Sequence, residues 1–352
     1  MRAPSSETTI EAVRRIAPAA VRGGSAVACV RSLPGHPNVW KVALGDGSFL
    51  IAKQHVFAPL VRGEPHDMLA VEQLVHARLS GAPVPRLYAA DTEHDLVFFE
   101  WCGDRTLDDV CQEGATGACG RLVVEGFSRI QSLFCARSDD FAPRTFPGCY
   151  PGDLRRTWRR TTGSLASALP RLCSRLSGSA DGKRYAAMSG TFTELLQFLE
   201  QAAPLPGPTD YNARNIVIDP AARSLRFIEF SRIGWDWPER RLTQYTTSHG
   251  AGRPDGGIRS VLTPALAARY AALASEYRAE PLAEIEALLD GHHFVFHLLA
   301  ARTLLDALPD PGHPLLERWR NPEARLAQLR RILSIPLCGD PRTTALRSCF
   351  AS

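Results

Sequence analysis

The stretch Thr209-Asp210-Tyr211-Asn212-Ala213-Arg214-Asn215-Ile216-Val217-Ile218-Asp219, followed by Phe227-Ile228-Glu229-Phe230-Ser231, decides the fold. Segments 216–219 and 225–230 have the pattern of two short strands separated by a turn, so they predict a hairpin. Asp210 lies on the loop before this hairpin, Asn215 opens its first strand, and Glu229 ends its second strand. We therefore expect the hairpin to bring three oxygen-bearing side chains to one end.

Carboxylate and amide oxygens at that end indicate two kinds of chemistry. Magnesium prefers oxygen ligands and takes only one or two protein groups beside water and phosphate oxygens. The carboxylate of Asp210 can accept a proton from a hydroxyl group, or orient that hydroxyl for attack. The alternative is that Asp210 and Asn215 simply occupy turns, which both residue types favour.

The sequence before this stretch predicts a small sheet and one helix. Segments 39–44 and 48–54 flank the turn Gly45-Asp46-Gly47, which is typical of a hairpin. Apolar residues at helical spacing predict a helix over 65–80, and segments 87–89 and 95–101 resemble two further strands. The first hundred residues therefore form a strand-rich lobe.

The remaining sequence is mainly helical. Helical patterns run from Thr106 to about Gln201, with a Pro- and Gly-rich loop at 143–152. After the hairpin, three further helices are predicted, at 262–279, 282–308 and 322–332. The sequence thus predicts an α+β protein with a small β-rich lobe, residues 1–101, and a larger helical lobe, residues 102–352.

Composition excludes several classes of protein. With 352 residues, of which 45% are apolar and 22% charged, the chain is an ordinary globular protein. It has no membrane-length apolar run and no signal-peptide pattern, so we expect a cytoplasmic protein without a membrane partner. The net charge is only +4 and the basic residues are scattered along the sequence, which argues against nucleic acid as a partner. The nine cysteines contain no C-x-x-C pair, so they indicate neither a zinc site nor a disulfide framework.

These segments, taken in order, resemble the aminoglycoside phosphotransferase and choline kinase-like family of the protein-kinase-like superfamily. In that family a His-Gly-Asp loop, with Asn five positions later, precedes a strand, a turn and Ile-Asp-Phe. Here Pro208-Thr209-Asp210, Asn215 and Ile228-Glu229-Phe230 occupy those places. The resemblance implies a two-lobed kinase-like fold. It further implies a catalytic loop at 208–215 with Asp210 as the catalytic residue, and a metal-binding strand end at 228–231, with Asn215 and Glu229 holding Mg²⁺.

The same resemblance implies a phosphate site in the small lobe. Segment 34–42 is similar to the family's nucleotide loop, with Gly35 and Asn38 near the phosphates of ATP or GTP. Lys53 is one of only three lysines, and it matches the strand lysine that contacts the α- and β-phosphates. Glu72 matches the ion-pair partner of that lysine, and Glu64 is the fallback. A surface turn at 34–42 and a solvated Lys53 remain the alternatives.

The base of the nucleotide is expected at the connection between the lobes. Segment 96–103 is similar to the family's hinge, and the resemblance implies that backbone groups of Glu100, Trp101 and Cys102 hydrogen-bond a purine edge. The aromatic side chains of Phe98 and Phe99 are better explained by core packing.

Three positions around the catalytic loop differ from the family pattern. Pro208 replaces a histidine, Glu229 replaces the metal-binding aspartate, and Arg241 replaces an aspartate that braces the loop. Pro208 loses a donor but stiffens the loop, and Glu229 keeps the charge on a longer side chain. Arg241 has three candidate partners, Glu229, Glu239 and Asp210.

These differences leave two functions open. The first is transfer of the γ-phosphoryl group from ATP or GTP to a hydroxyl of a small molecule, antibiotic-type or metabolite-type. The second is a nucleotide-binding or inert pseudokinase that acts as a regulatory or interaction protein. An ion pair between Arg241 and Glu229 would favour the second.

The acceptor and the oligomeric state are not predicted. The charged residues of the helical lobe that could contact an acceptor are Asp255, Glu276, Glu284, Asp290, Arg240, Arg253 and Arg259, although surface solvation explains most of them. His293 and His297 stand four residues apart, a spacing that can bind zinc. Because they lie in an apolar segment, we expect them in the core instead.

Overall fold

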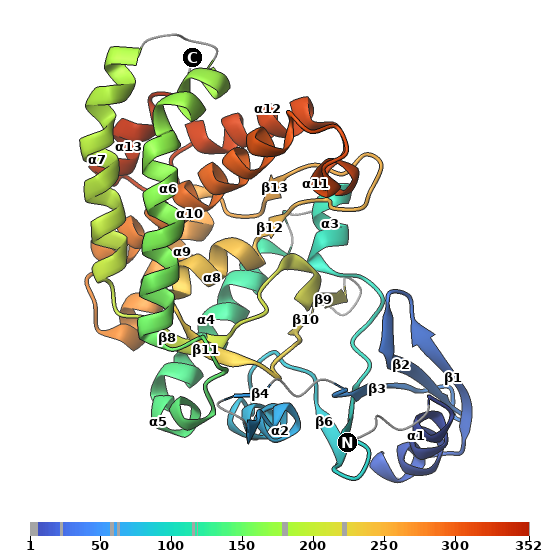
Figure 1. The fold of residues 1–352 in the computed structure, drawn as a ribbon. Coiled ribbons are helices and arrows are strands. Elements are labelled where there is room, and N and C mark those ends of the chain that lie inside the picture. Colours follow the sequence, from blue (N-terminus) through green and yellow to red (C-terminus); the bar gives the residue numbers. More distant parts are fainter. Residues whose placement is uncertain are drawn as a thin grey trace.

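An antiparallel five-stranded sheet is the centre of the N-terminal part of the molecule (Figure 1). The structure, a computed structural model, describes residues 6–21, 24–56, 60–61, 64–114, 117, 119–177, 182–219 and 224–351. The strand order is β1-β2-β3-β7-β6. Their bounds are β1 Val27–Leu33, β2 His36–Leu44, β3 Phe49–Gln54, β6 Leu87–Asp91 and β7 Leu96–Glu100. The predicted hairpin and the two further predicted strands are therefore confirmed.

Each face of this sheet is covered by one helix. The side chains of β3 alternate, so that Leu50 and Ala52 face helix α1 (Ser6–Ala20) while Lys53 lies on the opposite face. Helix α2 (Met68–Arg78) covers that opposite face through Leu69, which packs on Val97 and Phe99 of β7. The sequence predicted α2 but not α1. Two short strands, β4 (Leu60–Val61) and β5 (Glu64–Pro65), precede α2.

Helices make up most of the chain after β7 (Figure 1). They are α3 Leu107–Glu113, α4 Gly120–Ala136, α5 Ser138–Phe141, η1 Ala142–Arg144, α6 Pro151–Ser177, α7 Gly182–Gln201, η2 Ala213–Asn215, α8 Pro238–Tyr245, α9 Pro264–Arg278, α10 Leu282–Ala307, α11 Pro314–Arg318, α12 Pro322–Ser334 and α13 Pro341–Arg347. The predicted helices near 262–279, 282–308 and 322–332 correspond to α9, α10 and α12. Among the helices in the described ranges, none combines the length and the apolar character that a membrane crossing requires.

Three two-stranded ribbons lie among these helices. They are β9 (Ile216–Asp219) with β10 (Ser224–Phe227), β8 (Leu205–Pro208) with β11 (Ile233–Asp236), and β12 (Thr247–Ser248) with β13 (Arg259–Ser260). The predicted hairpin at 216–230 is present, but the prediction that Glu229 ends its second strand is wrong. That strand ends at Phe227, and Glu229 has a left-handed backbone with φ of 70°. A strand cannot continue through that conformation.

Three histidines of α10 (Leu282–Ala307) are buried, and a fourth, His249, is half-buried against the same helix. His292, His293 and His297 lie on α10, and His249 stacks on Trp319 with ring centroids 4.9 Å apart. Burial lowers the pKa of His292 and His297 to about 3 and that of His249 to about 4. The expected core placement of His293 and His297 is therefore what the structure shows, and the four rings are neutral in the folded protein.

We expect this cluster to make the protein sensitive to acid. In the unfolded chain a histidine has a pKa near 6.5, so it binds a proton at pH values where the ring in the folded protein is still neutral. The free energy of unfolding is therefore highest above about pH 6.5 and falls as the pH drops toward 4. Each histidine should contribute a slope of about 1.4 kcal/mol per pH unit over that window. Urea unfolding at a series of pH values between 7.5 and 5 measures the slope.

His292 is the best single test of this effect. Neither ring nitrogen has a hydrogen-bond partner in the described part of the chain, and the ring packs on Trp158 and Trp237. His292→Leu should reduce the slope by about 1.4 kcal/mol per pH unit, whatever packing offset it adds at all pH values. The exposed His36→Leu is the matched control and should keep the wild-type slope. An unchanged slope in His292→Leu would contradict the prediction.

Candidate active site

Lys53 on β3 is held between two carboxylates. Its Nζ lies 3.3 Å from both Oε1 and Oε2 of Glu72 on α2 and 3.0 Å from Oε2 of Glu229. The side chains of Lys53 and Glu72 are 13% and 2% exposed, so this ion pair is shielded from water. The structure therefore brings together Lys53, Glu72 and Glu229, three of the residues that the sequence singled out. The side chain of Glu64, the fallback partner, lies outside the described residues.

The charges of this group stabilise one another. Burial alone lowers the pKa of Lys53, but the carboxylates of Glu72 and Glu229 outweigh it and raise that pKa above its ordinary value. Burial raises the pKa of Glu72, but Lys53 and His55 outweigh it and lower that pKa to about 2. The Nε2–H of His55 donates a hydrogen bond to Oε2 of Glu72 at 2.7 Å. His55 was not predicted as a site residue, although it stands two residues after Lys53, directly after the end of β3, where the alternation of a strand would place it on the same face.

Asp210 lies on the loop between β8 and η2. Its side chain is exposed, and its Oδ1 accepts a hydrogen bond from Nδ2 of Asn212 at 3.1 Å. The residue before it is anchored, because the N–H of Thr209 donates to the carbonyl of Arg232 at 3.1 Å. The residue after it is anchored as well, because the hydroxyl of Tyr211 donates to Asp236. Asp210 is thus an exposed carboxylate on a loop fixed at both sides.

Asn215 connects Asp210 to Glu229. Its Nδ2 donates to the carbonyl of Asp210 at 2.8 Å, and its own carbonyl accepts from the N–H of Ile228 at 2.9 Å. The buried amide is therefore oriented by its nitrogen, which leaves the oxygen Oδ1 for a cation. One amide oxygen and one carboxylate are a donor set that fits Mg²⁺.

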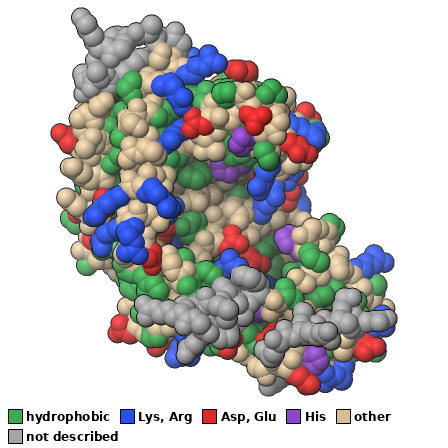
Figure 2. Space-filling model, in the orientation of Figure 1, with side chains coloured by type: hydrophobic (Ala, Val, Ile, Leu, Met, Phe, Trp, Pro, Cys, Tyr) green, Lys and Arg blue, Asp and Glu red, His purple; other side chains and the backbone are tan. Residues whose placement is uncertain are grey.

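One cavity of about 220 Å³ joins Lys53, Asp210 and Glu229. It is lined by Lys53, Gln54, His55, Val56, Met68, Asp210, Glu229, Ser231 and Arg232. Figure 2 shows the surface hollowed between the sheet and the helical part, with acidic and basic side chains meeting in the hollow. The residues from the two halves of the sequence therefore face a common space.

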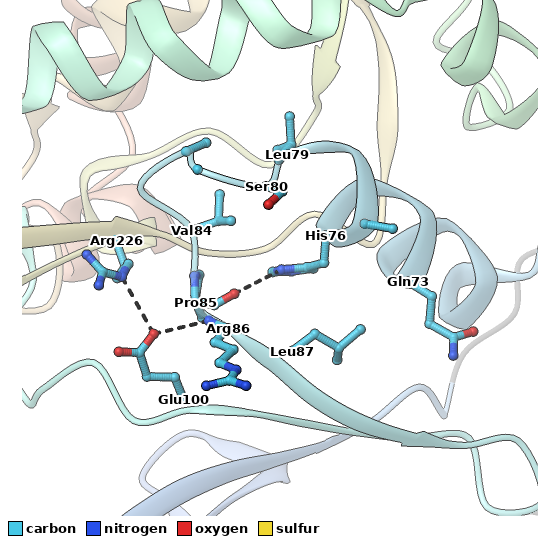
Figure 3. Close-up of a pocket in the computed structure, with 13 residues that line it drawn as sticks. Gln73, His76, Leu79, Ser80, Val84, Pro85, Arg86, Leu87, Glu100 and Arg226 are labelled. Atoms are coloured by element: carbon cyan, nitrogen blue, oxygen red, sulfur yellow. Dashed lines mark hydrogen bonds and ion pairs between the residues drawn. The ribbon is translucent and has the colours of Figure 1, made fainter. Parts of the chain in front are cut away.

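At the end of β7, the side chain of Glu100 is bound to residues of neighbouring segments. Oε2 of Glu100 accepts from the N–H of Arg86 at 3.1 Å and pairs with Nε of Arg226 at 3.6 Å (Figure 3). These residues line a second cavity of about 430 Å³. Because the Glu100 N–H also donates to the carbonyl of Arg86 at 2.9 Å, a purine would have to use the backbone from the Glu100 carbonyl to Cys102.

The ring of Trp101, directly after β7, makes a cation–π contact with Lys41. Nζ of Lys41 lies 3.8 Å from the centroid of Trp101 and 3.3 Å from Oδ1 of Asp104. Cys102 is half-buried, and its Sγ donates to the carbonyl of Glu100 at 3.4 Å. Lys41, on β2 of the sheet, is thereby linked to the segment that leads into the helical part.

The β1–β2 turn lies at the end of the sheet where Lys53 is found. Pro34 and Gly35 form the turn, and Gly35 has φ of 76° with open space around the position of a Cβ. Asn38 is half-buried on β2, next to Val39, which pairs with Lys53 across the strands. The turn therefore extends from the Lys53 end of β3.

Arg241 occupies none of the three ion pairs that the sequence left open. Among the described residues, its guanidinium bonds to main-chain carbonyls and one amide. These are the carbonyls of Leu205 and Gly234 at 2.9 Å, the carbonyl of Pro206 at 3.4 Å and Oε1 of Gln131 at 3.2 Å. Burial lowers the pKa of Arg241, and the nearby Asp236 offsets part of that cost. Arg241 therefore holds β8 and β11 together by donating to their carbonyls, and Pro208 ends β8.

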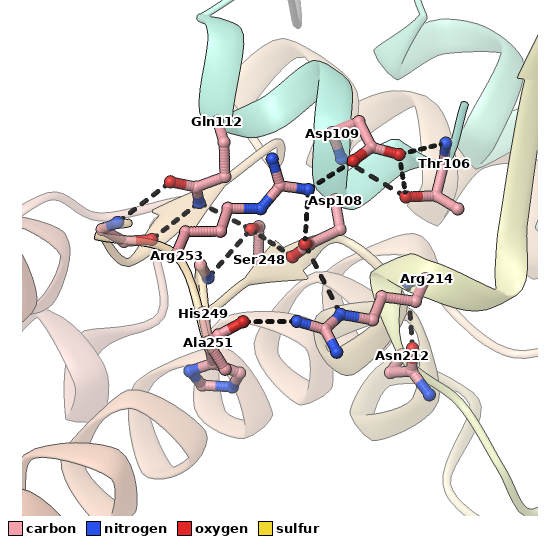
Figure 4. Close-up of polar contacts among 12 residues, drawn as sticks. Thr106, Asp108, Asp109, Gln112, Asn212, Arg214, Ser248, His249, Ala251 and Arg253 are labelled. Carbon is pink, nitrogen blue, oxygen red and sulfur yellow. Dashed lines mark hydrogen bonds and ion pairs between the residues drawn. The ribbon is translucent and has the colours of Figure 1, made fainter. Parts of the chain in front are cut away.

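A second polar network holds the other side of the loop. Arg214 of η2 donates to the carbonyl of Ala251 at 2.5 Å, and its Nε lies 3.5 Å from Asp108 on α3 (Figure 4). Arg253 binds both Asp108 and Asp109, and Ser248 donates to Asp108 at 2.6 Å. The network joins the turn that ends at Asn215 to α3 and to the loop at 249–257.

Several charged residues that were candidates for contact with the acceptor instead form ion pairs within the protein. Arg253 is paired as described, and Arg240 bonds Asp236 at 2.6 Å. Asp290 is fully buried, where it pairs with Arg347 and accepts from Thr343 at 2.6 Å. These three side chains therefore have partners within the protein. Asp255 and Arg259 are exposed.

Solved structures have the same arrangement of elements. The choline kinase from Cryptosporidium parvum Iowa II superposes with a TM-score of 0.51 at 10% identity, over 93% of this chain and 95% of that chain. The macrolide 2'-phosphotransferase MphH from Brachybacterium faecium superposes with a TM-score of 0.50 at 11% identity, over 87% and 96%. The sequence itself matches no family model and no curated protein. The chain thus has the two-lobed α+β fold that this choline kinase and this macrolide 2'-phosphotransferase share.

Proposed function

We propose that this protein transfers the γ-phosphoryl group of ATP or GTP to a hydroxyl group of a small molecule. One observation carries the proposal. Lys53, Asp210 and Glu229 line a single cavity, and Lys53 is fixed by Glu72. A cation for phosphates, a carboxylate for a hydroxyl proton and an oxygen ligand for a metal are the parts that phosphoryl transfer needs.

Each residue has a defined task in this reaction. Lys53 contacts the α- and β-phosphates, with Glu72 orienting its ammonium, and Gly35 and Asn38 lie at the phosphates. As the acceptor oxygen bonds to the γ-phosphorus, Asp210 takes the hydroxyl proton. The bond from that phosphorus to the β–γ bridging oxygen breaks, and its electron pair leaves with the nucleoside diphosphate. Asn215 and Glu229 would hold Mg²⁺, which neutralises charge on the phosphate oxygens when bound.

The base and the acceptor occupy opposite ends of the site. The backbone of Glu100, Trp101 and Cys102 is where we place the purine. Among the proteins of similar fold, one is named a macrolide 2'-phosphotransferase and another a choline kinase. Hydroxyl-bearing antibiotics and small amino alcohols are therefore the acceptors to screen first.

The alternative of a nucleotide-binding or inert pseudokinase lacks its expected support. An ion pair between Arg241 and Glu229 would favour it, whereas Arg241 bonds to carbonyls of β8 and β11. Glu229 pairs with Lys53 instead, the cation that a nucleotide would recruit. We therefore favour the catalytic function.

Thermal unfolding with nucleotide tests the proposal. ATP or GTP at 100 times its dissociation constant should stabilise the folded protein by about 2.7 kcal/mol, because only the folded state binds it. This stabilisation should require magnesium and should disappear in Lys53→Ala, which removes the phosphate contact. Melting temperatures with each nucleotide, with and without magnesium, provide the measurement.

The control replaces a cation far from the cavity. Arg129→Ala removes an exposed arginine on α4 and should keep the full nucleotide effect. A shift that is indifferent to magnesium would favour the pseudokinase. No shift with either nucleotide would contradict phosphoryl transfer altogether.

A further inference from the structure

We infer that Arg232 is a further phosphoryl-binding residue, whose guanidinium contacts the oxygens of the group in transfer. The inference rests on the proposed function and adds to it a residue that the sequence analysis did not single out. Arg232 lies three residues after Glu229 and directly before β11.

The backbone of Arg232 is built into the catalytic loop. Its carbonyl accepts from the N–H of Thr209 at 3.1 Å and from the Thr209 hydroxyl at 3.4 Å. Thr209 is the neighbour of Asp210, so the position of Arg232 is fixed relative to that carboxylate. Because these bonds use main-chain atoms of Arg232, they survive replacement of its side chain.

The side chain of Arg232 lines the cavity that Lys53, Asp210 and Glu229 also line. The guanidinium carbon lies 5.0 Å from the ring centroid of Phe146, which restricts its motion. Within the described part of the chain, no carboxylate comes within 4.0 Å of this guanidinium. Arg240, eight residues later, has its charge matched by Asp236. Arg232 is therefore a half-buried cation without a carboxylate partner among the residues that the structure describes.

A phosphoryl group is the ligand that this charge suits. The γ-phosphoryl group would enter a space bounded by the carboxylates of Asp210 and Glu229, and both repel it. Lys53 is already shared between Glu72 and Glu229. The planar guanidinium of Arg232 can bond two phosphoryl oxygens at once and oppose the repulsion from Asp210. It would do so while the bond to the bridging oxygen breaks and the bond to the acceptor oxygen forms.

Binding of a phosphoryl mimic tests this assignment without an acceptor. The probes are MgADP or MgGDP alone, and each with aluminium fluoride, which occupies the place of the transferring group. In the wild type, aluminium fluoride should tighten nucleotide binding by roughly 100-fold or more, as transition-state analogues do. In Arg232→Gln we expect nearly all of this gain to disappear, while the affinity for the nucleoside diphosphate alone stays at its wild-type value. Isothermal titration calorimetry measures both affinities.

Two further variants separate binding from structure. Arg232→Lys keeps the charge but not the paired donors, so it should recover only part of the gain. Arg144→Gln removes an exposed arginine on η1, outside the cavity, and should behave as wild type. Should Arg232→Gln not fold, the comparison of Arg232→Lys with Arg144→Gln decides the question.

The outcomes distinguish this inference from the function on which it rests. If the wild type binds neither diphosphate with magnesium, the proposed function fails. If the wild type binds one of them and Arg232→Gln keeps the full aluminium fluoride gain, only the role of Arg232 is overturned. That role is also overturned if the wild type binds a diphosphate but gains nothing from aluminium fluoride. A loss seen only with an anionic acceptor, and not with aluminium fluoride, would move Arg232 to the acceptor and also overturn the inference.

Discussion

Asp210→Asn should lower the rate of phosphoryl transfer by about 10³-fold, because the amide cannot take the proton of the acceptor hydroxyl. The replacement has the same shape, and its oxygen can still accept the bond from Asn212. Since the side chain is exposed, the free energy of unfolding should change by no more than about 0.5 kcal/mol. Release of the nucleoside diphosphate, with water or a screened alcohol as acceptor, gives the rate.

The nucleotide affinity separates this effect from damage to the site. MgATP or MgGTP should bind Asp210→Asn at least as tightly as wild type, because one repulsive charge near the phosphates is gone. Asp139→Asn, on the exposed side of α5, is the control and should retain the wild-type rate. A rate for Asp210→Asn within tenfold of wild type would remove Asp210 from the reaction.

Arg241→Leu should lower the free energy of unfolding by about 3–5 kcal/mol, because it leaves several buried acceptors unsatisfied at a cost of about 1–3 kcal/mol each. Arg241 is 0% exposed and donates to the carbonyls of both β8 and β11. Leucine would leave those carbonyls and Oε1 of Gln131 without their donor, while Asp236 would keep its ion pair with Arg240.

Urea unfolding at pH 7.5 measures this loss. Arg144→Leu replaces an exposed arginine and should change stability by no more than about 0.5 kcal/mol. A change in Arg241→Leu as small as in the control would mean that the guanidinium contacts contribute little. Because the ribbon carries the loop with Asp210, we also expect the surviving folded protein to lose activity.

Periodic patterns predicted most of the fold correctly. The alternation in β2 and β3 and the helical spacing of α2, α9, α10 and α12 were readable, because each element buries one regular face. Helix α1 was missed although Ala12, Val13 and Ala17 have helical spacing, because Pro18 and a short apolar stripe weaken the pattern. Strand β8 was missed because its prolines are typical of turns, yet a two-stranded ribbon tolerates them.

One ion pair of the candidate site was predictable from the sequence, but the other contacts of the site were not. Lys53 and Glu72 form the expected ion pair, since a strand residue and a helix residue on one sheet face have few ways to meet. The contact of Lys53 with Glu229 depends on the left-handed backbone at Glu229, which residue types alone do not indicate. The partners of Arg241 are carbonyls, and a search for acidic partners in the sequence cannot find them.

The contacts of Arg241 also determine which positions of β8 tolerate substitution. Every residue has a main-chain carbonyl, so a substitution at Leu205 keeps the acceptor to which Arg241 donates. That freedom stops at Gly207, where an added Cβ would lie 2.6 Å from Nη1 of Arg241. Strand β8, which leads into the loop with Asp210, therefore tolerates substitution at Leu205 but not at Gly207.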